Sequence, residues 1–216
     1  MKKLVIFDLD GTLLDTIGDL AASCDEVLRR HNMATYSLDD YKHFVGNGIV
    51  RLVERAIPDS LRSEEFIAEL RKEFVAYYFE NIDKHTVIYP QIMWLLEELQ
   101  RRDIKIAVAS NKFQEGVRKL VASFFPDIQF EAVLGQRPNI PLKPDPQIVN
   151  DIIQLTSYSQ KQILYVGDSG IDMETAKAAG IESIGVTWGF RSREELVESG
   201  ANHIVDSPEE ILKLIE

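Results

Sequence analysis

The chain has only one cysteine, Cys24, among its 216 residues. A single cysteine cannot form an internal disulfide, so the disulfide-rich class of small secreted domains is excluded. Cys24 lies in a helical pattern beside Ala21 and Ala22, which indicates a small buried side chain and not a reactive thiol. This cysteine usage is typical of a reducing compartment, and we expect a cytoplasmic protein.

Long apolar runs and positive charge are also scarce. Leu4 to Phe7 follows two lysines as in a signal peptide, but Asp8 ends the apolar run far short of the length that a signal peptide needs. No later stretch has the length of a transmembrane segment. The chain has 24 Lys and Arg against 35 Asp and Glu, a net charge of −11. Without a basic surplus to displace counterions, we expect no binding to nucleic acid or to membranes.

Apolar runs alternate with helical patterns at the start of the chain and again after residue 89. The runs that predict strands cover 4–7, 104–109, 130–134, 163–166 and 183–187, with a short edge strand that ends at Val205. Helical patterns cover 91–102, 113–124, 147–155 and 171–179, and two last helices follow Ser192 and Ser207. This alternation predicts an α/β fold with a doubly wound, Rossmann-like parallel sheet.

Between residues 16 and 83 the pattern is helical throughout. Helices are predicted at 17–31, after Ser37 with Asp40 in a capping box, along the apolar stripe from Ile49 to Ala56, and at 63–82 with Phe66, Leu70, Phe74, Tyr77 and Tyr78 facing inward. We therefore predict a small all-helical domain, residues 16–83, inserted into a core formed by residues 1–15 and 84–216.

Two carboxylates appear where the first apolar strand stops. Asp8 and Asp10 are two residues apart, so in extended chain they project to the same side, at the end of the sheet where α/β proteins bind ligands. Gly11 permits a tight turn, and Thr12 offers a hydroxyl and a backbone N–H to an anion. Taken alone, the stretch is also compatible with an ordinary Asp-Gly turn. A calcium-binding EF-hand loop is excluded by the position of its glycine and by its helical flanks.

Other predicted strands end in polar residues of the same kind. Ser110 and Asn111 follow one strand, Asp168 and Asp172 follow another, and Lys143 lies in the proline-rich loop between them. Each residue has an ordinary interpretation as a loop or solvated side chain. Their placement at successive strand ends favours a shared site.

This set resembles the four motifs of the haloacid dehalogenase superfamily, and the helical insert stands where that superfamily has its helical cap. The stretches that resemble the four motifs are Asp8-Leu9-Asp10-Gly11-Thr12, Ser110-Asn111, Lys143 and Gly167-Asp168-Ser169-Gly170-Ile171-Asp172. Within the superfamily, Phe44-Val45-Gly46-Asn47-Gly48 and Gly185-Val186-Thr187-Trp188-Gly189-Phe190 resemble the phosphoglycolate phosphatases.

The resemblance implies transfer of a phosphoryl group to the chain itself. Asp8 would attack phosphorus to give an aspartyl-phosphate, and Asp10 would protonate the leaving alkoxide and then deprotonate the hydrolytic water. Ser110 and Lys143 would hold phosphate oxygens. The residues expected to contact substrate are Thr12 and Asn111 in the core, and Gly46, Asn47 and Gly48 in the cap.

Carboxylates facing an anionic phosphate require a hard divalent cation, and oxygen-only ligands suit Mg²⁺. By the resemblance, its ligands are the Asp8 side chain, the Asp10 carbonyl and Asp168, while Asp172 lies behind them and orients water or Lys143.

The best expectation is a Mg²⁺-dependent phosphatase for a small phosphorylated metabolite, 2-phosphoglycolate above others, in a monomer or weak homodimer. Asp10 argues against true dehalogenases and phosphonate hydrolases of the superfamily. A sugar phosphomutase like β-phosphoglucomutase, a pyrophosphatase and a non-catalytic phosphate-binding protein remain open. A dinucleotide enzyme is disfavoured because no G-x-G-x-x-G follows the first strand.

Overall fold

The computed structural model describes residues 1–215 and divides into two compact units. One unit joins Met1–Asp15 to Ile88–Glu216, and the other is Thr16–Val87. The second crossing therefore falls at 87/88 and not at the predicted 83/84. The reason is Asp19 in the first helix, whose carboxylate accepts the backbone N–H groups of His85 at 2.9 Å and Thr86 at 2.8 Å. These bonds keep the segment before Ile88 with the helical unit.

The first unit is organised by a six-stranded sheet with the strand order β5-β4-β1-β6-β7-β8, and every pairing in it is parallel. The strands are β1 (Leu4–Phe7), β4 (Lys105–Phe113), β5 (Ala132–Gln136), β6 (Ile163–Gly167), β7 (Glu182–Val186) and β8 (His203–Val205). Phe7 pairs with both Val108 and Val166, so β1 lies between β4 and β6. Strand order reverses at β1, and such switch points are where open α/β sheets bind ligands.

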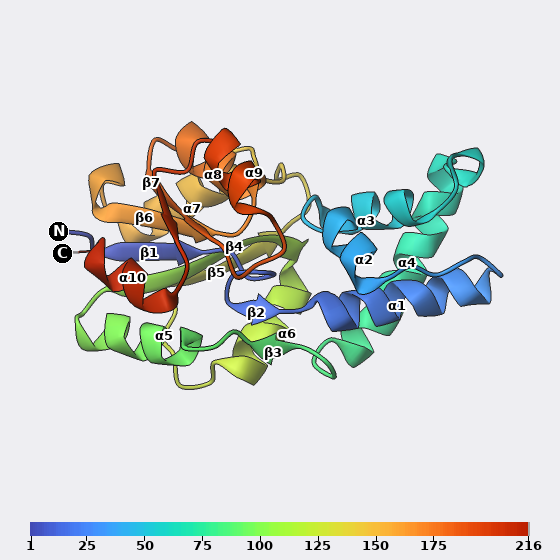
Figure 1. Cartoon of the computed structure of the whole chain (residues 1–216), viewed down its shortest axis with the longest axis horizontal. Coiled ribbons are helices and arrows are strands. Elements are labelled where there is room, and N and C mark those ends of the chain that lie inside the picture. Colours follow the sequence, from blue (N-terminus) through green and yellow to red (C-terminus); the bar gives the residue numbers. More distant parts are fainter. Residues whose placement is uncertain (216) are drawn as a thin grey trace. The chain divides into compact units, whose positions relative to one another are not determined.

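Helices cover both faces of this sheet, as the predicted α/β class requires (Figure 1). On one face lie α5 (Ile92–Arg101), α6 (Gln114–Phe124) and α10 (Pro208–Lys213), and on the other α7 (Gln147–Thr156), α8 (Gly170–Ala178) and α9 (Arg193–Glu198). A short 3-10 turn, η2 (Gln160–Gln162), precedes β6. No helix in residues 1–215 is long and apolar enough to cross a membrane.

The core explains why these strands lack polar alternation. All four residues of β1 are fully buried, because helices cover the sheet on both sides. One hydrophobic cluster joins Ile6, Ala109 and Tyr165 of the central strands to Val149 and Ile152 of α7. Tyr165 is fully buried in this core.

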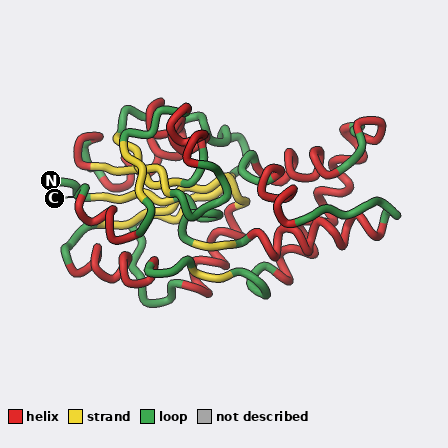
Figure 2. Tube along the Cα trace, viewed as in Figure 1, coloured by secondary structure: helices red, strands yellow, loops and turns green. Residues whose placement is uncertain are grey.

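The second unit consists of helices and loops up to its last residue (Figure 2). Its elements are α1 (Ile17–Arg30), α2 (Leu38–Phe44), α3 (Gly48–Ala56), the 3-10 turn η1 (Asp59–Leu61) and α4 (Glu64–Asn81). Ser37 caps α2 in a capping box with Asp40, as the sequence predicts. In α4, Leu70, Phe74 and Tyr78 are buried as expected, while Phe66 and Tyr77 are half-buried.

Three features of the strands differ from the prediction. β4 continues to Phe113, so Ser110 and Asn111 lie within the strand, with a register shift between Ala109 and Phe113 against β5. β5 begins at Ala132, two residues later than expected. Two short strands, β2 (Leu14–Asp15) and β3 (Val87–Ile88), form a separate two-stranded sheet that the apolar pattern does not reveal.

The bonds of Asp19 lead to a prediction about stability. Replacing Asp19 by Ala leaves the backbone N–H groups of His85 and of the buried Thr86 without this acceptor, so we expect a loss of about 2 to 4 kcal/mol in the free energy of unfolding. Urea denaturation of wild type and variant measures it. The control is Asp39→Ala, which removes a largely exposed carboxylate paired with Lys42 and should cost less than about 0.5 kcal/mol. Equal effects of the two changes would contradict the role given to Asp19.

Candidate active site

The site begins at the turn that follows β1. The backbone carbonyl of Leu9 accepts hydrogen bonds from the N–H groups of Thr12, Leu13 and Leu14, which closes a tight turn directly after Asp8. Gly11 has φ +87°, and a Cβ there would run into the carboxylate of Asp168. Only glycine lets the turn approach Asp168 this closely. The turn thus brings the carboxylates that follow β1 and β6 to one place.

Lys143 is the charged centre of this place. Its buried ammonium contacts Asp172 at 2.7 Å and Asp8 at 2.9 Å, the carbonyl of Ala109 at 2.9 Å and the hydroxyl of Tyr165 at 3.0 Å. Burial alone would lower the pKa of Lys143, but the nearby carboxylates of Asp172 and Asp8 raise it well above its usual value. The side chain is therefore a fixed positive charge.

Asn111 and Ser110 support this arrangement from β4. The Asn111 side chain donates to the carbonyl of Lys143 at 3.1 Å and accepts from its N–H at 2.8 Å. Asn111 therefore holds the backbone of the lysine loop, a function that the sequence does not indicate. The Ser110 hydroxyl is buried and accepts the N–H of Lys112 at 3.2 Å. Substrate contacts for Ser110 and Asn111 stay a prediction.

Asp168 lies at the end of β6 and is held by neutral donors. The Thr12 hydroxyl donates to one of its oxygens at 3.1 Å, and the backbone N–H of Phe190 donates to the other at 2.8 Å. The hydroxyl that we expected to contact an anionic substrate is thus directed at a carboxylate of the chain. Burial, followed by the charge of Asp172, raises the pKa of Asp168 to about 7.

Three buried carboxylates gather at this point: Asp8, Asp168 and Asp172 offer oxygens that all lie within 4.8 Å of one another. Burial raises the pKa of Asp8 well above its usual value, against the lowering effect of Lys143. Asp172 accepts from the hydroxyl of Ser169 at 2.6 Å as well as from Lys143. A cluster of hard oxygen donors, in which the charged forms of Asp8 and Asp168 are unfavourable without metal, fits a divalent cation such as Mg²⁺.

Lys112 joins the site without having been expected there. Its ammonium contacts the two carboxylate oxygens of Asp10 at 2.8 and 3.0 Å, and its side chain is only 3% exposed. The sequence contains the signal, a lysine directly after Ser110 and Asn111. A strand that ends at residue 109, as the apolar pattern predicts, does not include Lys112, whereas β4 continues to Phe113.

The predicted cap residues form the turn between α2 and α3 in the helical unit. Gly46 and Gly48 have positive φ angles, and Asn47 is the residue before α3. The side-chain oxygen of Asn47 accepts from Arg55 at 2.9 Å, and Arg55 also donates to the carbonyl of Phe44. These contacts stabilise the turn. Substrate binding by Gly46, Asn47 and Gly48 stays a prediction.

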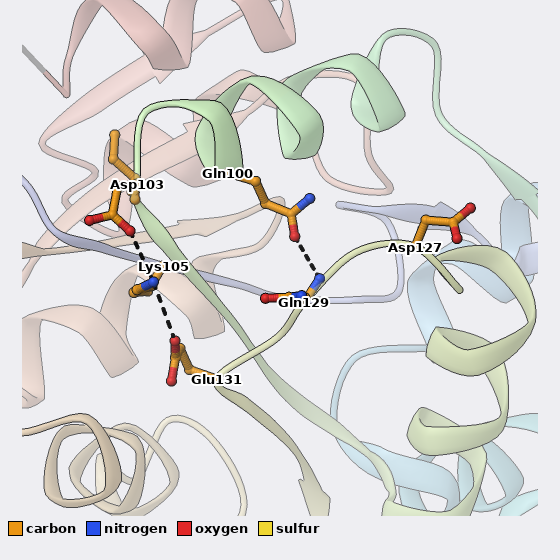
Figure 3. Close-up of a pocket in the computed structure, with 7 residues that line it drawn as sticks. Gln100, Asp103, Lys105, Asp127, Gln129 and Glu131 are labelled. Carbon is orange, nitrogen blue, oxygen red and sulfur yellow. Dashed lines mark hydrogen bonds and ion pairs between the residues drawn. The ribbon is translucent and has the colours of Figure 1, made fainter.

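A polar hollow of about 330 Å³ lies elsewhere on the first unit, near the start of β4 (Figure 3). Lys105 contacts Asp103 at 3.0 Å and Glu131 at 3.9 Å there, and the N–H of Gln129 donates to Gln100. Since β4 begins here and carries Ser110 near its other end, the hollow is remote from the acidic cluster. It does not belong to the candidate active site.

Comparison with known proteins identifies the family of the chain. Residues 5–186 match the family model of haloacid dehalogenase-like hydrolases. The chain belongs to this family. The resemblance seen in the motifs is thereby confirmed, and the chain is an enzyme of the hydrolase class.

Relatives within the family carry a more specific description. The phosphoglycolate phosphatase of Vibrio cholerae is 32% identical over 223 residues, which cover 99% of this chain and 96% of the relative. That of Pseudomonas putida is 30% identical, over 95% of this chain and 77% of the relative. A solved structure from Haemophilus somnus, a predicted phosphoglycolate phosphatase, has a TM-score of 0.92 at 30% identity and covers all of this chain and 98% of its own.

The raised pKa of Asp168 predicts how stability depends on pH in the metal-free protein. The value of about 7 lies above the usual 3.8, so the folded state holds this proton more tightly than the unfolded chain. Stability then falls as pH rises from about 4 through about 7, and going from pH 6 to pH 8 should cost on the order of 1 kcal/mol. Melting temperatures measured in chelator at both pH values test this.

Two variants and the addition of Mg²⁺ test whether Asp168 causes this pH dependence. Asp168→Asn should reduce the difference between the melting temperatures at pH 6 and pH 8, while Asp206→Asn, which changes an exposed carboxylate, should leave it unchanged. Mg²⁺ should stabilise more at pH 8 than at pH 6, because metal and proton compete for the same oxygens. A metal-free protein that is more stable at pH 8 would overturn the assignment.

Proposed function

We propose that the chain is a Mg²⁺-dependent phosphatase that hydrolyses small phosphate monoesters through an aspartyl-phosphate on Asp8, with 2-phosphoglycolate as its best substrate. The observation that carries the proposal is the contact of the buried Lys143 ammonium with Asp8, beside Asp168 and Asp172. A nucleophilic carboxylate, a fixed cation and an oxygen-rich metal site are together what phosphoryl transfer requires. The phosphoric monoester hydrolase class follows from the family and from the phosphatases among its relatives.

In the first half of the reaction, a carboxylate oxygen of Asp8 attacks phosphorus in line with the leaving oxygen. The bond between phosphorus and the alcohol oxygen breaks, and Asp10 gives its proton to the alkoxide. In the second half, Asp10 takes a proton from water as the water oxygen attacks phosphorus. The bond to Asp8 breaks, orthophosphate leaves, and both aspartates return to their starting states.

The other residues bind and orient. Lys143 holds a phosphate oxygen and keeps Asp8 in place, and Ser110 donates a hydrogen bond to the phosphoryl group. Mg²⁺ would be held by the Asp8 side chain, the Asp10 carbonyl and Asp168, and when bound it neutralises charge on the transferring group. Asp172 orients Lys143, which it contacts at 2.7 Å.

The identity of the substrate rests on the relatives. Curated relatives described as phosphoglycolate phosphatases cover nearly the whole chain at about 30% identity. The proposal includes the sequence-based expectations of a cytoplasmic enzyme that is a monomer or weak homodimer and acts on a free metabolite and not on nucleic acid or membranes. The net charge of −11 supports the last point.

Removal of the metal gives a direct prediction. We expect release of free phosphate from 2-phosphoglycolate with Mg²⁺, and a loss of at least about 100-fold after treatment with chelator, because Lys143 alone does not offset the acidic cluster together with an anionic phosphate. A phosphate assay measures turnover, and restoring Mg²⁺ is the control. Equal turnover without metal would reject the mechanism. Incubation with a sugar phosphate distinguishes the phosphatase from the alternative of a sugar phosphomutase, because a mutase would yield an isomer of the sugar phosphate and no free phosphate.

The nucleophile gives a second prediction. Asp8→Asn keeps the shape of the side chain but removes the attacking charge, so turnover should fall by about 1000-fold or more. The fold should persist, as circular dichroism can check. Glu98→Gln serves as a matched control, because Glu98 is a carboxylate of α5 that pairs with Arg101 and Arg102, and turnover of this variant should stay at the wild-type level. Covalent phosphate trapped on any residue other than Asp8 would contradict the assignment.

A further inference from the structure

Lys112 is a buried cation that the phosphoryl chemistry described above does not use. Its relative exposure is 5%, and its distances of 2.8 and 3.0 Å to the two Asp10 carboxylate oxygens are both hydrogen-bonding distances. Burying an ammonium is costly unless anions surround it. Lys143 already provides the cation beside the nucleophile, so a second buried lysine needs a separate explanation.

The two lysines serve different sides of the reaction. Lys143 contacts Asp8, the group that takes the phosphoryl. Lys112 contacts Asp10, the group that takes and gives the proton of the leaving alcohol. The leaving oxygen must come within about 3 Å of an Asp10 oxygen for proton transfer. Since Lys112 Nζ lies 2.8 Å from Asp10 Oδ1, a substituent one carbon away from the leaving oxygen can be oriented toward this ammonium.

The charge of such a substituent matters because the neighbourhood is acidic. Asp8, Asp168 and Asp172 lie together, and an additional negative charge on the leaving group would be repelled there. An ammonium at the leaving-group side offsets that repulsion for an anionic alcohol. For an alcohol without charge it offers no gain. The side chain therefore discriminates between these two classes of ester.

We propose that Lys112 is a specificity-determining residue that binds an anionic group, a carboxylate, carried by the leaving alcohol one carbon away from the ester oxygen. The proposal rests on the proposed function and extends it to the choice of leaving alcohol. Glycolate, released from 2-phosphoglycolate, has this structure. A residue with the single role of holding Asp10 in place would affect all esters alike, and this difference makes the proposal testable.

The experiment compares two esters in three proteins. The esters are 2-phosphoglycolate and ethyl phosphate, which share the phosphate and the first carbon and differ in the carboxylate. The proteins are wild type, Lys112→Met, which removes the charge, and Lys112→Arg, which keeps it. We expect Lys112→Met to lose about 10- to 100-fold more kcat/KM on 2-phosphoglycolate than on ethyl phosphate, mainly through KM. Lys112→Arg should restore most of the difference between the esters.

Lys105→Met is the matched control, a lysine at the start of the same strand whose partners are Asp103 and Glu131. This variant should have the wild-type kcat/KM on both esters. If Lys112→Met does not fold, Lys112→Gln replaces it. Equal losses on the two esters, or no loss, would overturn the proposal. If the wild-type enzyme prefers ethyl phosphate, the proposal for Lys112 is also overturned, but the assignment as a phosphatase stands.

The design separates this proposal from the substrate named above. If wild type prefers another phosphorylated hydroxy acid, and Lys112→Met removes that preference, 2-phosphoglycolate is the wrong substrate and Lys112 keeps its role. If no ester is hydrolysed, the proposed function fails. Calorimetric titration with glycolate then decides, because binding that is lost in Lys112→Met and kept in Lys112→Arg supports the role of Lys112. Absence of glycolate binding in all of them rejects it.

Discussion

The ion pairs of Lys143 are the interaction on which the site depends. One buried ammonium holds Asp8, which follows β1, to Asp172 in α8, and it also reaches Ala109 of β4. Removing any one anion would leave the buried ammonium with fewer partners, which is costly. Asn111 fixes the backbone of the same lysine from β4. The contacts of Lys143 thus both position the candidate catalytic groups and join the strand ends around them.

Close backbone approach is the second constraint. A Cβ at Gly11 or at Gly189 would overlap Asp168, and one at Gly167 would overlap Asp172. Three segments distant in sequence therefore converge on the carboxylates because they carry no side chains at these points. The Trp188 indole N–H donates to the Thr12 carbonyl at 3.0 Å and ties two of these segments together.

The sequence predicts most of this fold and the acidic part of the site, for reasons that are local. Continuous apolar runs identify the buried strands, and parallel strands place Asp8 and Asp168 at the same edge. What it does not predict depends on pairing between distant segments. The end of β4 depends on its pairing with β5, whereas the apolar pattern ends the strand at residue 109 and leaves Lys112 outside it. The bonds of Thr12 to Asp168 and of Asn111 to Lys143 join residues 156 and 32 positions apart, which no local pattern reveals.

The same burial that organises the site also strains it energetically. Desolvation raises the pKa of both Asp8 and Asp168, so their charged forms destabilise the folded protein when no metal is bound. A divalent cation would lower the cost of these negative charges, whereas an anionic substrate would add to it. A bound cation would stabilise the carboxylates, so less of the negative charge near the ammonium groups of Lys143 and Lys112 would remain unbalanced. Under the proposed function, an anionic ester would therefore bind more tightly after the metal than before it, because the metal would offset carboxylate charge where the phosphate would lie.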